Sequence, residues 1–315
     1  MPGVLGVTSP ALARPGAVAA DPPDAGVAAH YGDPYREQRL LVAGEASVDL
    51  SHRDVVRVAG PDRLGWLHSL TSQHVEHLAA GEPTEALLLS PQGHVEHALA
   101  LVDDGTATWA HVEPGGAAEL VRFLDSMRFW SQVEVEDLTT SHAVVLRPEA
   151  FPGAVARRVP EGVESFVRRE ELDDALAGDL AGVWALEALR VAAGRPRFGL
   201  ETDHRTIPHE VGWIPSAVHL DKGCYRGQET VARVQNLGRP PRRLVLLHLD
   251  GSDSELPALG DPVLLDGRDV GRVTTAARHY ELGPIALAVV KRSTPADAGL
   301  LAGGVAASQE VLVPA

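Results

Sequence analysis

The sequence contains a single cysteine, Cys224, among 315 residues. One cysteine can form no disulfide within the chain, and it cannot supply the set of thiolates that binds a structural zinc ion or an iron–sulfur cluster. The lack of disulfides favours a reducing compartment, and we expect a cytoplasmic protein. Any disulfide chemistry at Cys224 would need a thiol from another molecule.

Long apolar runs and positive charge are also scarce. No stretch approaches the roughly 18–20 apolar residues that a membrane helix needs, so we expect no membrane association. The chain carries 28 Lys and Arg residues against 43 Asp and Glu residues, a formal net charge of −15. This balance argues against nucleic acid as a partner, although a few arginines in one pocket can still bind a small anion.

The remaining composition is that of a folded, water-soluble protein. Hydrophobic residues make up 44% and charged residues 23% of the chain, which is the ordinary globular range. A chain of this length exceeds what one core usually supports, so two or three domains are expected. We expect a monomer.

The pattern along the chain predicts three regions. Residues 1–29 are rich in Ala, Pro and Gly without periodicity, which predicts a disordered leader. Strand-like and helix-like segments alternate over 30–240. Short strand-like runs separated by Gly, Asp and Pro follow Pro240-Pro241, and they predict a small all-β barrel over 241–315.

Several elements can be assigned within 30–240. Apolar spacing predicts helices over 64–78, 115–130, 170–180 and 183–193, and strands over 55–58, 85–90, 95–102, 106–112, 133–138 and 143–146. The segment 195–218 has no regular pattern. Irregular segments of this length are usually functional or disordered.

The most informative segment runs from Lys222 to Glu229 and surrounds the cysteine. Gly223 and Gly227 flank Cys224, so the chain can present the thiol on a tight turn before a helix that begins near Gln228. Positive charge from Lys222, Arg226 and Arg233 would favour the thiolate, which makes Cys224 the candidate catalytic residue. The alternative is that Cys224 is a small buried side chain with no chemical role.

Histidines are numerous, but their spacing does not predict a metal site. On a strand, His94 and Glu96 share one face while His97 points to the other, so the three cannot converge on one ion without a β-bulge. His74 and His77 have helical spacing, which alone is typical of surface residues. We therefore expect no metal.

The motif Lys222-Gly223-Cys224-Tyr225-x-Gly227-Gln228-Glu229 resembles the signature of the YgfZ folate-binding family. Residues 186–197, 206–210 and 60–67 resemble other segments of that family, so the similarity extends from about His30 to the C-terminus. Its relatives include the aminomethyltransferase T-protein of the glycine cleavage system. The resemblance implies an α+β fold arranged as a three-domain cloverleaf, with two interwoven α+β domains in 30–240 and a C-terminal β-barrel.

The same resemblance implies a binding site for tetrahydrofolate or a one-carbon derivative. Glu210 would accept hydrogen bonds from the pteridine ring, while Arg233, or secondarily Arg190, would bind the carboxylate tail. For each arginine, the alternative is a structural ion pair. The T-protein's catalytic aspartate corresponds to Glu96 here, and the longer side chain argues against ordinary aminomethyl transfer.

Three functions follow from these observations. The resemblance favours a tetrahydrofolate-binding factor that assists the assembly or maintenance of iron–sulfur proteins, with iron–sulfur client or assembly proteins as partners. A folate-dependent one-carbon (aminomethyl or methyl) transferase or demethylase is the enzymatic alternative, with Glu96 or another acid in proton transfer. The third is a folate-sensing module in which Cys224 is structural, so the sequence leaves open whether the protein is an enzyme.

Overall fold

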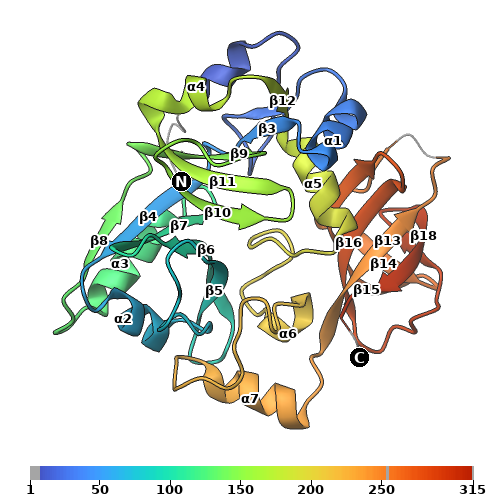
Figure 1. The fold of residues 1–315 in the computed structure, drawn as a ribbon. Coiled ribbons are helices and arrows are strands. Elements are labelled where there is room, and N and C mark those ends of the chain that lie inside the picture. Colours follow the sequence, from blue (N-terminus) through green and yellow to red (C-terminus); the bar gives the residue numbers. More distant parts are fainter. Residues whose placement is uncertain (1–7, 253–254, 314–315) are drawn as a thin grey trace. The chain divides into compact units, whose positions relative to one another are not determined.

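A computed structural model of the chain describes residues 8–252 and 255–313. Contacts divide the chain into two compact units, Met1–Leu87 with His97–Leu186 and Leu88–Glu96 with Glu187–Ala315. The chain is coloured by sequence in Figure 1. Within the described ranges, no helix is both long and apolar enough to cross a membrane.

The first unit contains a five-stranded sheet with the order β10-β11-β9-β3-β12. β12 pairs in parallel with β3, and the other neighbours are antiparallel. Its strands are β3 (Ala46–Asp49), β9 (His142–Arg147), β10 (Val155–Val159), β11 (Gly162–Arg168) and β12 (Asp179–Ala181).

A second five-stranded sheet has the order β5-β6-β7-β4-β8. Its strands are β4 (Asp54–Ala59), β5 (Pro83–Leu89), β6 (Val95–Asp103), β7 (Ala107–Val112) and β8 (Glu134–Asp137). The chain therefore contributes β3 to one sheet, builds the whole of the other with β4 to β8, and then returns to the first. The two sheets are interleaved in sequence, and residues 88–96 at the β5–β6 turn belong to the second unit.

Short helices accompany these sheets. Helix α1 begins at the Asp33 cap, whose carboxylate accepts hydrogen bonds from two backbone N–H groups, and ends at Gly44 with a φ of 68°. Helix α3 buries Leu120 and Leu124 on one face. The helices of the first unit are α1 (Pro34–Ala43), α2 (Arg63–Leu70), α3 (Ala117–Ser126) and α4 (Leu172–Ala175), with 3₁₀ turns η1 (Pro10–Ala13) and η2 (Arg169–Glu171).

The prediction of a disordered leader is wrong for residues 8–29, whereas residues 1–7 lie outside the described residues. Strands β1 (Val18–Ala19) and β2 (Ala28–His30) pair with each other. Ala11 and Val27 are fully buried, and Asp24 Oδ1 lies 2.8 Å from Nε2 of the buried His52. Small residues without periodicity can pack as a closely fitted segment, which a composition argument misses.

The helix predicted over 64–78 is also too long, since α2 ends at Leu70. Ser72 N–H donates to Leu87 O at 2.9 Å, and Ser72 Oγ accepts from Leu87 N–H at 3.0 Å. These bonds fix the following residues against β5 as a loop. Similarly, the helix predicted over 170–180 is α4 followed by strand β12, and strands β10 and β11 were not predicted.

The second unit is built around a closed six-stranded barrel with the order β13-β16-β15-β14-β17-β18. Its core includes Val245, Leu247, Val273 and Ala288, all fully buried. The barrel strands are β13 (Arg242–Leu249), β14 (Pro262–Leu265), β15 (Arg268–His279), β16 (Gly283–Lys291), β17 (Leu300–Ala302) and β18 (Val305–Val311). Helices α5 (Val183–Ala192), α6 (Pro208–Val211) and α7 (Gln228–Leu237) precede it along the chain.

A buried charged group links the two sheets of the first unit. Glu164 on β11 accepts from Arg157 on β10, and its Oε2 lies 2.9 Å from Nε2 of His111 on β7. Burial opposes ionisation of Glu164, but His111 and Arg157 outweigh it and hold the pKa of this carboxyl well below its usual range. The carboxylate is therefore charged at neutral pH.

We expect Glu164→Gln to destabilise the first unit by about 3–5 kcal/mol, because it leaves the buried Arg157 without its counter-charge. Urea unfolding at pH 7 measures the effect. The matched control is Glu149→Gln on an exposed residue. Equal unfolding midpoints for the two variants would contradict this role of Glu164.

The same group predicts a pH dependence. A depressed pKa stabilises the folded state fully above the unfolded-state pKa, about 4.3 for Glu, and this contribution is lost as the pH falls toward the folded-state pKa. The difference in unfolding free energy between the wild type and Glu164→Gln should therefore shrink between about pH 5 and pH 3. A gap that widens on acidification would contradict the assignment.

Candidate functional site

Two glycines in the second unit bring the β5–β6 turn against the start of α7. Gly227 has a φ of 83°, and a Cβ placed there would lie 2.5 Å from Ser90 O and 3.0 Å from Gly93 Cα. Gly93 has a φ of 81°, and its Cβ would lie 2.8 Å from Cβ of Thr230. No side chain fits between the two backbones, so the Cys224 motif is positioned by direct contact with this turn.

Cys224 is exposed, three residues before the Gly227 cap of α7. The neighbouring side chains are buried instead. Lys222 Nζ lies 4.9 Å from the centroid of the Tyr225 ring, and burial raises the pKa of Tyr225 to about 12. The tyrosine therefore anchors the turn, while the thiol remains accessible to another molecule.

Glu96 and Arg226 form an ion pair beside this turn. Arg226 Nη1 donates to Glu96 Oε2 at 2.6 Å, and about a third of each side chain is exposed. Glu96 thus lies next to the cysteine motif, but its carboxylate is bound to an arginine. The carboxylate of Glu96 is therefore engaged by Arg226, and it could take a proton from a substrate only if this pair were broken.

A second cluster of polar side chains surrounds Glu210 on α6. Helix α6 contacts both α7 and β13. Arg242 donates from Nε to Glu210 Oε1 and from Nη2 to Glu210 Oε2, both at 2.8 Å. Glu210 Oε2 also accepts from Ile207 N–H at 3.1 Å. Val95 N–H donates to Thr206 O at 2.9 Å, so the strand that carries Glu96 adjoins the loop leading to Glu210.

Arg242 also binds Asp203, and neither residue was predicted from the sequence. Burial opposes ionisation of Asp203, but hydrogen bonds from Arg242 outweigh it and lower the pKa of this carboxyl. The hydrogen bond that Arg242 donates to Glu210 raises the pKa of the Arg242 guanidinium, so this arginine is held in its charged form. The only signal in the sequence was a pair of arginines, Arg242 and Arg243, at the start of an apolar strand.

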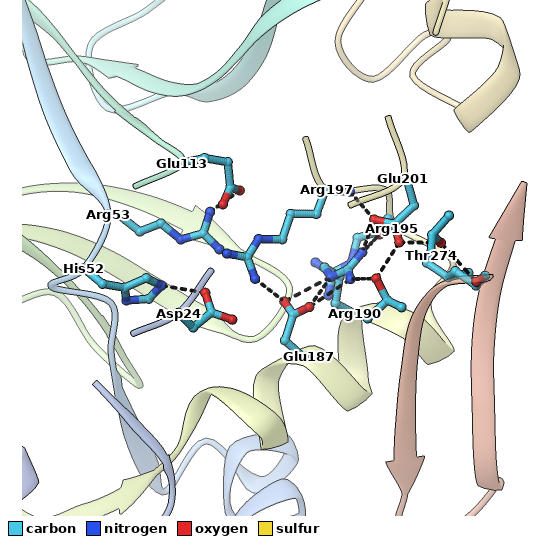
Figure 2. Close-up of polar contacts among 12 residues, drawn as sticks. Asp24, His52, Arg53, Glu113, Glu187, Arg190, Arg195, Arg197, Glu201 and Thr274 are labelled. Atoms are coloured by element: carbon cyan, nitrogen blue, oxygen red, sulfur yellow. Dashed lines mark hydrogen bonds and ion pairs between the residues drawn. The ribbon is translucent and has the colours of Figure 1, made fainter. Parts of the chain in front are cut away.

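Arg190, the second candidate for a folate tail, lies within a buried network (Figure 2). Its Nε and Nη2 donate to Glu187, and its Nη1 donates to Glu201 at 2.9 Å and to Arg195 O at 2.6 Å. Nη2 donates further to Thr275 Oγ1 at 2.9 Å. All five N–H donors of Arg190 are occupied, which favours the structural alternative for this residue.

Arg233 differs from Arg190 because its side chain is exposed on α7. Among the described residues, no ion pair to Arg233 is present. The structure therefore brings Cys224, Lys222 and Glu96 together around the turn, with Glu210 on the adjoining segment. Arg190 lies in a separate network, and the side chain of Arg233 is exposed on α7.

Sequence comparisons connect the chain to known proteins. Residues 242–313 match the family described as the glycine cleavage T-protein C-terminal barrel domain. An aminomethyltransferase of Geobacillus kaustophilus is 30% identical over 310 residues, covering 83% of each chain. A chloroplastic protein of Arabidopsis thaliana named as a transferase is 25% identical over 290 residues, which cover 77% of this chain but only 65% of that relative.

A solved structure has the same fold. The glycine cleavage system aminomethyltransferase T from Bartonella henselae superposes with a TM-score of 0.80, covering 94% of each chain at 19% sequence identity. The predicted α+β class with a C-terminal β-barrel is thus confirmed.

We expect Gly227→Ala to destabilise the second unit more than Gly199→Ala does. Both glycines have a positive φ near 85°, but a Cβ at Gly199 meets no atom within 4 Å, whereas one at Gly227 collides with Ser90 O. Backbone strain of about 1–3 kcal/mol is common to both, and only Gly227→Ala adds the collision. Chemical denaturation of the two variants measures the difference, and equal losses would contradict the close approach.

Proposed function

The chain belongs to the aminomethyltransferase family, which includes the glycine cleavage T-protein, and from this premise we propose that it binds tetrahydrofolate or a one-carbon derivative. We propose further that it is of the YgfZ type and uses the Cys224 thiol to assist the assembly or maintenance of iron–sulfur proteins. The observation that carries this proposal is the exposed Cys224 on a turn flanked by glycines, within the YgfZ-like motif.

The chemistry of the second unit is compatible with a folate. Among the residues that the structure describes, Glu210 Oε1 accepts from Arg242 Nε alone, and it retains one acceptor position for a ring N–H of a pteridine. Arg233 supplies the planar fork that pairs with a carboxylate tail. When bound, tetrahydrofolate would supply a one-carbon carrier, while the protein's own residues hold and orient it.

The single cysteine supports a role on other proteins. A lone thiol cannot hold a four-cysteine cluster, so iron–sulfur chemistry at Cys224 would act on a client or assembly protein. The exposed thiol is accessible to such a partner. A reducing compartment such as the cytoplasm is part of this proposal, because it keeps the thiol free.

The second candidate is a one-carbon transferase or demethylase. The names of the bacterial relatives favour it, since several are aminomethyltransferases. The ion pair between Glu96 and Arg226 weighs against it, because Glu96 would be the carboxylate placed for proton transfer. Multiple-turnover product formation from a folate-linked one-carbon donor would favour this candidate over the assembly factor.

Calorimetric titration of tetrahydrofolate tests the binding proposal. We expect saturable one-to-one binding to the wild type and a dissociation constant at least ~10-fold weaker for Arg233→Ala, since a hydrogen bond between charged groups is lost. The control is Arg268→Ala, which removes an exposed arginine from the barrel. Because both residues are exposed, neither variant should impair folding.

Two further variants separate the ligand site from the thiol. Cys224→Ala should retain the wild-type affinity, whereas Glu210→Gln should weaken binding, with circular dichroism confirming that its fold is kept. A well-folded wild type that does not bind tetrahydrofolate would disprove the folate proposal. Binding that is lost with Cys224→Ala would place the thiol inside the ligand site.

A cellular experiment addresses the iron–sulfur role. In cells that lack this protein, we expect the activity of iron–sulfur enzymes to fall, and we expect the wild type but not Cys224→Ala to restore it. Enzymes without a cluster serve as the control. Full restoration by Cys224→Ala would favour the folate-sensing module in which this cysteine is structural.

A further inference from the structure

Three side chains with metal-binding atoms meet in the first unit, between α2 and β5. His68 lies near the end of α2, and His74 and Glu76 lie in the loop that follows. One potential ligand atom from each residue lies within 4.8 Å of the other two. His68 Nε2 is 4.0 Å from Glu76 Oε2, and the rings of His68 and His74 are 4.7 Å apart.

The backbone that carries these residues is held by buried contacts. Leu67, the neighbour of His68, and Val75, between His74 and Glu76, are each only 1% exposed. Thr71 Oγ1 donates to Leu67 O at 2.8 Å, and Leu78 N–H donates to Val75 O at 3.1 Å. The main chain that carries the three residues is therefore held in place, and rotation of their side chains alone can change the distances between the ligand atoms.

We propose that His68, His74 and Glu76 form a binding site for a first-row divalent cation, with zinc as the best match. Two imidazole nitrogens and one carboxylate oxygen are a common ligand set for zinc, and a fourth position is then open to water or another residue. The His77 ring lies 5.9 Å from that of His74, which makes His77 the candidate fourth ligand.

The distances require a modest closure. Zinc bonds of about 2.0–2.2 Å in a tetrahedron place ligand atoms roughly 3.3–3.6 Å apart. The three ligand atoms lie within 4.8 Å of one another, so each separation must shorten by about 1.5 Å at most. The Glu76 side chain is 49% exposed and can rotate toward the histidines.

The consequence for the protein would be a cross-link between the end of α2 and its following loop. An ion that binds only the folded chain stabilises it by mass action. This site is independent of the folate and thiol chemistry proposed for the second unit, so either can fail without the other.

Titration of the metal-depleted, untagged full chain with cobalt(II) chloride tests the proposal, because cobalt(II) substitutes for zinc and its visible absorption reports ligand geometry. We expect one cobalt ion per chain, displaced by one equivalent of zinc chloride, and a higher melting temperature with the ion. His68→Asn and His74→Asn should each weaken cobalt binding by more than ~10-fold, since loss of even an outer-sphere partner often costs this much.

The matched control is His248→Asn, an exposed histidine on the barrel, which should bind cobalt like the wild type. Circular dichroism without metal verifies that the two cluster variants remain folded. Absence of saturable one-to-one binding by the wild type would overturn the proposal. So would unchanged affinity in both His68→Asn and His74→Asn, because the ion would then lie on other residues.

Discussion

Pairing between arginines and carboxylates underlies the second unit. Arg190 connects helix α5 through Glu201 to strand β15, and Arg242 connects strand β13 to Glu210 on α6. Once such charges leave water, each needs its partner, because an unpaired buried charge is far more costly than the pair. The chain between α5 and the barrel is thus held by these charge pairs together with buried apolar side chains such as Val211, Trp213 and Val218.

The apolar and turn patterns were sufficient to predict most strands and the barrel. Residues 106–112 and 143–146, for example, differ from β7 and β9 by only one residue at some ends. The failures occurred where tertiary contacts override local spacing. Ser72 pairs with Leu87 and ends the helix predicted over 64–78, and the Ala- and Gly-rich residues 8–29 pack through Ala11 and Val27 without any periodic signal.

The site was predicted less completely than the fold. The glycines around Cys224 indicated a tight turn. They did not indicate that the backbone at Gly227 would pack directly against Ser90 of the β5–β6 turn. Nothing in one sequence distinguishes an arginine that is enclosed by carboxylates, such as Arg190, from one that is exposed, such as Arg233. The His68 cluster was hidden for a different reason, since a continuous helix would have separated His68 from Glu76 by two turns.

The interleaving of the two sheets determines the order in which they can form during synthesis. Among the strands of residues 8–252 and 255–313, β3 pairs with β9 and β12 alone, and β9 begins at His142, some 93 residues after β3 ends at Asp49. At about 5–20 residues per second, β3 waits roughly 5–20 s for its first neighbour. All five strands of the sheet formed by β4 to β8 are synthesised in that interval. The emerging chain can therefore complete the sheet of β4 to β8 before β9 and β12, the two neighbours of β3, have been synthesised. Until then β3 has two unpaired edges, so it is the segment most in need of protection on the ribosome.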